Sequence, residues 1–147
     1  MFRRPVLVST ALVAVLVLGS SLLACDAGDD SAVPARYAAT IDFQGMAPHV
    51  GQMLELRVVH GSTGVEVAYW RVPWVVTPNF VVTAADCLIV GESYYVDFYA
   101  DLNGNGHYDT PPTDHAWRRW IGPVTGPMVL SFTHDTIWTD IDFPAHP

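Results

Sequence analysis

A two-residue alternation of apolar and polar side chains, which recurs from Tyr37 to the end of the chain, most constrains the fold. Successive side chains of a β-strand point to opposite faces, so this alternation is typical of strands that bury one face. The same part of the chain lacks the spacing of apolar positions typical of a helix, and the eleven prolines oppose long helices. The apolar runs lie at Tyr37–Phe43, Leu54–Val58, Val65–Tyr69, Phe80–Thr83, Tyr94–Ala100, Met128–Phe132 and Ile137–Phe143.

About seven short strands predict an all-β fold, a single antiparallel β-sandwich that covers residues 36–147. The segment H-G-S-T-G after Leu54–Val58 predicts a hairpin with the run that follows it. The cysteine pair typical of immunoglobulin domains is missing, so the pattern leaves an immunoglobulin-like and a transthyretin-like sandwich both open.

The first 25 residues, MFRRPVLVSTALVAVLVLGSSLLAC, have the order of an export signal: two arginines, an apolar run from Val6 to Leu18, then small residues. The last four, L-L-A-C, resemble the lipobox of bacterial lipoproteins. The resemblance implies that residues 1–24 are a cleaved signal peptide and that Cys25 carries the lipid. The protein would then be anchored in the bacterial cell envelope, at the periplasmic face or the cell surface. The alternative is an uncleaved signal anchor, because the apolar run approaches the roughly 20 residues that span a bilayer.

Residues 25–35 are short, acidic and rich in small side chains, and they predict a flexible tether. The whole chain has 15 acidic and 7 basic residues, a formal net charge of −8. Affinity for nucleic acid depends on basic residues that neutralise phosphates, so we expect no nucleic-acid partner. The same acidic charge favours cations.

Only two cysteines are present, and lipidation of Cys25 would leave Cys87 without a partner in the chain. Cys87 then either pairs with another chain or is buried as a small hydrophobic residue. The domain must therefore be stable through its core or through a bound ion.

The segment D-L-N-G-N-G-H-Y-D, which follows the predicted strand Tyr94–Ala100, matches the opening of the calcium-loop pattern D-x-[DN]-x-[DN]-G. Calcium takes six to eight oxygen ligands, and a loop with this spacing presents oxygens at alternate positions while Gly106 permits the sharp turn. The predicted ligands are Asp101, Asn103, Asn105, the backbone carbonyl of His107, and Asp109.

This segment resembles EF-hand-like calcium loops, including the shorter D-x-N-x-N-G-x-x-D loops of exported bacterial β-domains. The resemblance covers nine residues and implies a structural calcium ion, bound with a Kd on the order of 10⁻⁴–10⁻³ M. The loop departs from the EF-hand pattern because a strand precedes it and because Pro112 replaces the final glutamate, which leaves Asp114 as a candidate closing ligand. A plain connection is the alternative, since Asn-Gly pairs favour type I′ turns.

Six histidines and five tryptophans offer a different kind of site. His60 and His134 end predicted strands on the core side and would bind copper, zinc or haem iron if they met. His107 and His115 lie near the calcium-loop segment. By alternation, Trp70 and Trp138 fall on the polar face of their strands, where tryptophans could stack on sugars; core packing is the alternative. The tryptophans are Trp70, Trp74, Trp117, Trp120 and Trp138.

No nucleophile elbow, H-E-x-x-H motif or assignable pair of acids is present, so we do not expect an enzyme, and a hydrolase is the least favoured class. The sequence predicts a lipid-anchored binding or structural module with a calcium-stabilised loop. The alternative is a ligand or metal carrier that uses histidines and tryptophans, with a protein or a carbohydrate as a further candidate ligand. Oligomeric state does not follow from the sequence.

Overall fold

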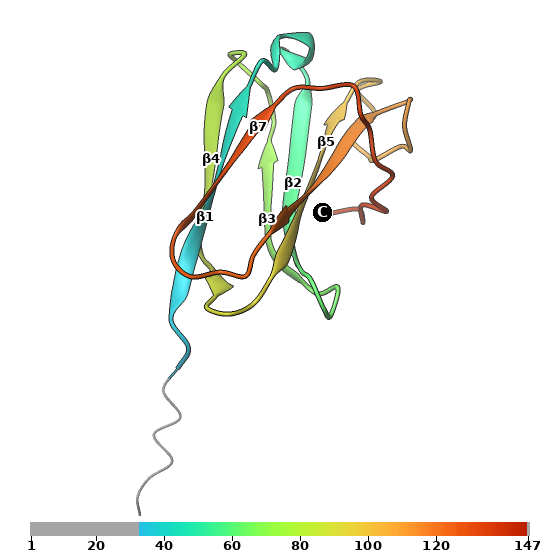
Figure 1. Cartoon of the computed structure of the whole chain (residues 1–147). Coiled ribbons are helices and arrows are strands. Elements are labelled where there is room, and N and C mark those ends of the chain that lie inside the picture. The colour runs from blue at the N-terminus through green and yellow to red at the C-terminus, as the bar shows by residue number, and fades with distance from the viewer. Residues whose placement is uncertain (1–32, 147) are drawn as a thin grey trace, which may run out of the picture. The chain divides into compact units, whose positions relative to one another are not determined.

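The computed structural model describes residues 33–146; the predicted signal peptide, Cys25 and most of the predicted tether lie outside the described residues. Seven strands and one short 3-10 helix form this part of the chain (Figure 1). They are β1 (Arg36–Gln44), η1 (Ala47–His49), β2 (Met53–His60), β3 (Glu66–Val72), β4 (Phe80–Ile89), β5 (Tyr94–Asp101), β6 (His115–Ile121) and β7 (Met128–Thr133). None of the described segments is a helix long and apolar enough to cross a membrane.

The strands form two sheets, with the orders β4-β1-β7 and β3-β2-β5-β6, packed face to face (Figure 1). This arrangement confirms the predicted all-β sandwich. The four-stranded sheet is antiparallel throughout, whereas β1 pairs antiparallel with β4 and parallel with β7. The parallel pair is possible because the chain crosses the whole second sheet between β1 and β7, which supplies the long connection that parallel strands require.

Aromatic rings fill the space between the sheets. Phe98 on β5 packs edge-on against Phe43 and Phe132, with ring centroids 5.2 and 4.8 Å away, and it stacks on Trp117 at 5.4 Å. All four rings are almost fully buried. Cys87 is also buried and free, as expected for a small hydrophobic residue.

The C-terminal segment after β7 differs from the sequence prediction. The apolar run Ile137–Phe143 was predicted as a strand, but residues 134–146 contain no regular secondary structure. The seven observed strands instead include β6, whose sequence HAWRRWI is not among the predicted strands. Ala116 and Trp117 are both buried there, because the C-terminal segment covers one face of β6 while the core covers the other. Burial on both faces removes the alternation on which the sequence prediction depended.

The side chains of β3 also face opposite to the prediction. Trp70 was placed on the polar face, but it packs against the core, while Val65 and Val67 are exposed. The pairing places Val58 opposite Ala68 but Val59 opposite Glu66, which leaves Val67 as an extra residue in β3. The alternation therefore changes phase at Val67, so that Ala68 and Trp70 face the core.

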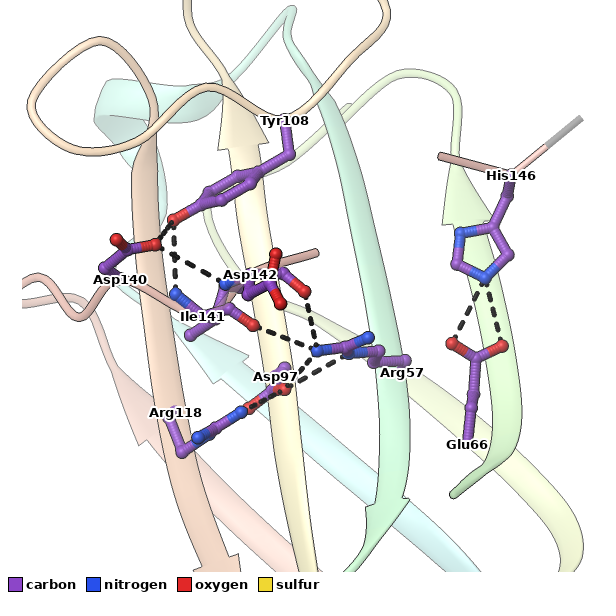
Figure 2. A network of polar contacts seen from close by, with 9 residues as sticks. All are labelled: Arg57, Glu66, Asp97, Tyr108, Arg118, Asp140, Ile141, Asp142 and His146. Carbon is purple, nitrogen blue, oxygen red and sulfur yellow. Dashed lines mark hydrogen bonds and ion pairs between the residues drawn. The ribbon is translucent and has the colours of Figure 1, made fainter. Parts of the chain in front are cut away.

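An ion-pair network lies between the four-stranded sheet and the C-terminal segment (Figure 2). Asp97 is fully buried on β5 and accepts hydrogen bonds from Arg57 on β2 and Arg118 on β6, at 3.1 and 2.6 Å. Arg57 also donates to the carbonyls of Ile141 and Asp142, at 3.0 and 3.2 Å. The single carboxylate therefore joins three strands and, through Arg57, the C-terminal segment.

We expect Asp97→Asn to lower the free energy of unfolding by about 3 kcal/mol, because it leaves two arginines without their buried carboxylate. Urea denaturation measures the change. Asp86→Asn is the matched control, since Asp86 is exposed on β4 and asparagine tolerates its positive φ of 51°. Equal stabilities of the two variants would contradict the role given to Asp97.

Candidate metal centre

Three histidines from separate parts of the chain meet at one end of the sandwich. His49 ends η1, His115 begins β6, and His134 directly follows β7. The ring centroid of His49 lies 5.2 Å from that of His115 and 5.0 Å from that of His134. One ring nitrogen of each residue lies within 4.8 Å of the other two. We call these three residues the histidine cluster.

Local structure places each histidine. Pro48 lies in the first turn of η1, where proline is favoured, and the backbone N–H of His49 donates to the carbonyl of Met46 at 2.9 Å. His115 pairs with Ala100 at the end of β5. The backbone N–H of His134 donates to the carbonyl of Gln44 at 2.9 Å, which continues the pairing of β1 and β7 by one residue.

Each ring of the histidine cluster has a buried nitrogen without a hydrogen-bond partner in the described part of the chain. These atoms are His49 Nε2, His115 Nδ1 and His134 Nε2. Buried polar atoms are nearly always hydrogen-bonded, and leaving one unpaired costs about 1–3 kcal/mol. Because one nitrogen of each ring lies within 4.8 Å of the other two, a single bound cation would contact all three rings.

The cluster favours neutral imidazoles. Burial lowers the pKa of His49, and the neighbouring His134 and His115 lower this pKa further, although a hydrogen bond with Gln52 raises it. The pKa of His115 is lowered by burial and by His134. Neutral imidazole is the form that coordinates metals, so the lowered pKa values of His49 and His115 favour coordination by these two rings.

The neighbours of the cluster orient its rings. Gln52 Oε1 lies 2.8 Å from His49 Nδ1, so this nitrogen serves as the donor and leaves His49 Nε2 as the coordinating atom. His115 stacks on Trp138 with centroids 4.0 Å apart. Asp135, next to His134, accepts from Trp117 Nε1 at 3.1 Å and from Arg119 at 2.7 Å.

The predicted calcium loop lies at the same end of the sandwich, between β5 and β6. Asp101 is buried, and its two carboxylate oxygens accept from the N–H groups of Gly104 and Gly106, at 2.7 and 2.8 Å. Asn103 and Asn105 are exposed and donate through their amides to Asp109, at 2.8 and 2.7 Å. Hydrogen bonds alone therefore hold the side chains of Asp101, Asn103, Asn105 and Asp109 within one loop.

Asp114 closes this loop. It is fully buried, and its carboxylate accepts from the N–H groups of Leu102 and Asp109, at 3.0 and 2.8 Å. Burial raises the pKa of Asp114, the two backbone hydrogen bonds lower it, and the nearby charges of Asp101 and Asp109 raise it again by less. A cation beside Asp114 would offset this charge repulsion, and calcium is a hard cation that prefers oxygen ligands. The side chain of His107 is exposed. Its backbone N–H donates to Asn105 Oδ1 at 2.8 Å.

A cavity of about 370 Å³ opens beside the same loop. Gln52, Trp74 and Asn103 are among its lining residues, and Trp74 is 64% exposed. The tryptophans do not gather on one surface: Trp117 lies in the core, and Trp70 and Trp138 pack against it. The predicted stacking platform of Trp70 and Trp138 is therefore absent from the described part of the chain.

No motif in the sequence links the three residues of the histidine cluster. His49 was not singled out, since it lies in a short connection without strand alternation. His60 and His134 do not meet, because His60 pairs with Tyr94 at the opposite end of β5 and contacts Glu92 at 3.2 Å. Only the core-side alternation that ends at His134 gave a signal in the sequence.

Comparisons of the chain with protein-family models, with curated proteins and with solved structures found no match in any of the three.

Proposed function

We propose that the protein is a lipid-anchored module of the bacterial cell envelope that binds a transition-metal ion through His49, His115 and His134. The observation that carries this proposal is the convergence of three imidazole rings from η1, β6 and the end of β7, each with one buried nitrogen that has no partner within residues 33–146. The envelope location is supported by the resemblance of L-L-A-C to a lipobox.

The ligand set favours zinc or copper. Imidazole suits these ions, whereas calcium and magnesium prefer oxygen ligands. Ligands at the usual Zn–N distance of about 2.0–2.1 Å in a tetrahedral site lie about 3.4 Å from one another. Since the three nitrogens already lie within 4.8 Å of one another, side-chain shifts of about 1 Å would complete the site.

A binding role is favoured over catalysis. Asp135 is the acid next in sequence to His134, and it is engaged by Trp117 and Arg119. A general acid or base needs a free group within hydrogen-bond reach of the reacting atoms. The arrangement supports capture or carriage of a metal at the cell envelope, the alternative that the sequence left open.

The calcium loop is a second candidate site, with a structural role. The buried, mutually repelling carboxylates of Asp101 and Asp114 favour it. A calcium ion there would stabilise the connection between β5 and β6, which ends at His115.

We expect zinc or copper(II) to raise the Tm of the protein, and His115→Phe to abolish the rise. Phenylalanine keeps a ring on Trp138, and no hydrogen bond of the His115 side chain is lost within residues 33–146. The chelator-treated variant should therefore match the wild type within about 1 kcal/mol. His60→Phe, at the other end of the sandwich, should respond to metal like the wild type. A wild type without metal response, or an H115F variant that still responds, would refute the proposal.

We expect fatty-acid labelling of the protein in a bacterial host to depend on Cys25. Cys25→Ser should lose both the label and the membrane association, because the serine hydroxyl does not replace the acylated thiol. Cys87→Ser is the control and should keep the label, since Cys87 is buried in the core. Retention of C25S in the membrane fraction would favour the uncleaved signal anchor instead.

We expect millimolar calcium to raise the Tm, and Asp101→Ala to abolish this increment even though the variant is itself less stable. The carboxylate of Asp101 both orders the loop and supplies the first predicted ligand. Calorimetry with calcium and with chelator measures the increment. Equal Tm values of the wild type with calcium and with chelator would mean that the segment is a plain turn.

A further inference from the structure

Three neutral imidazoles do not balance the charge of a divalent metal ion. The residues that the structure groups as candidate ligands are histidines alone, with no carboxylate or thiolate among them in the described part of the chain. His49 is 1% exposed, so the ion would sit where water compensates charge poorly. Three protein ligands also leave one position of a tetrahedral site open. The charge and the open position both favour an anion as the fourth ligand.

Trp138 offers an unused hydrogen-bond donor on a ring that contacts the histidine cluster. Its indole ring stacks on His115 with centroids 4.0 Å apart and planes 20° apart. Its Nε1 is buried and has no hydrogen-bond partner among residues 33–146. A buried indole N–H usually finds an acceptor, and Trp117 in the same region does so through Asp135. The Trp138 donor therefore lacks an acceptor that an anion on the metal would supply.

The backbone holds Trp138 in this place. The N–H of Thr139 donates to the carbonyl of Ala116 at 2.9 Å, and the N–H of Ile137 donates to Asp135 at 2.9 Å. The backbone is therefore hydrogen-bonded at the residues before and after Trp138. His115, His134 and Trp138 are only partly buried, unlike His49.

We propose that the metal-loaded histidine cluster binds a small exogenous anion as its fourth ligand, with the Trp138 indole N–H as hydrogen-bond donor to that anion. This inference rests on the proposed metal-binding function. It changes the character of the site from a closed structural centre to one with an exchangeable position. The ligand class is a small anion, such as hydroxide, a halide, azide or a carboxylate. Trp138 acts as a positioning residue and does not coordinate the metal.

The test uses the full chain in detergent, loaded with cobalt(II) in place of zinc. Cobalt bound by three imidazoles gives visible absorption bands that change when the fourth ligand is exchanged. We expect azide to shift these bands in a saturable titration. Trp138→Phe should keep the stacking on His115 and the cobalt affinity, but weaken azide binding about tenfold, through loss of one hydrogen bond to an anion. Trp120→Phe is the matched control, because Trp120 packs on Tyr95 near the other end of the sandwich and is 51% exposed.

The outcomes separate the two proposals. Absence of cobalt bands would overturn the proposed metal-binding function, and this inference with it. Cobalt bands that do not respond to azide would leave metal binding intact and overturn the exchangeable position. A saturable shift with equal azide affinities in W138F and the wild type would overturn the role of Trp138. If W138F does not fold, the azide titration of the wild type still decides whether the position is exchangeable.

Discussion

The buried carboxylate of Asp97 is the interaction on which the arrangement of this domain depends. It lies on the central strand β5 and holds Arg57 and Arg118 on the two neighbouring strands. Arg57 in turn holds the carbonyls of Ile141 and Asp142 (Figure 2). The C-terminal segment is thereby tied across the outer face of the sheet without being a strand. Breaking such a buried pair leaves uncompensated charge, so the network specifies one path for this segment.

That path matters for the histidine cluster. The segment starts at His134, continues through Trp138, and then crosses the sheet to pack Ile141 and Phe143 against Tyr99. The hydroxyl of Tyr108 donates to Asp140 of this segment at 2.9 Å, and His146 Nε2 of the segment lies 3.0 Å from the carboxylate of Glu66 on β3 (Figure 2). One anchored segment therefore supplies a candidate ligand and the indole beside it. The loop that ends at Asp114 positions His115 from the other side, so the two candidate sites share a structural support.

Patterning predicted most of the fold because the core lies on one face of most strands. Ile41 and Phe43 on β1 are buried as alternation requires. Both faces of β5 are buried, but Asp97 and Asp101 on its outer face kept the alternation in the sequence. The prediction was wrong in two other strands. On β6 both faces are covered, and in β3 an irregular pairing reverses the exposed side. The nine-residue calcium-loop pattern is local in the chain and stays a prediction; the structure shows that Asp101 and Asp109 both accept hydrogen bonds within this loop.

The sequence by itself determined the class of fold, the acidic character and the local loop, since each depends on neighbouring residues or on composition. The histidine cluster was decided by tertiary structure alone. His49, His115 and His134 lie far apart in the chain and share no motif spacing. They meet because η1 ends, β6 begins and β7 ends at one edge of two packed sheets. The burial that leaves their nitrogens without partners among residues 33–146 arises only from that packing.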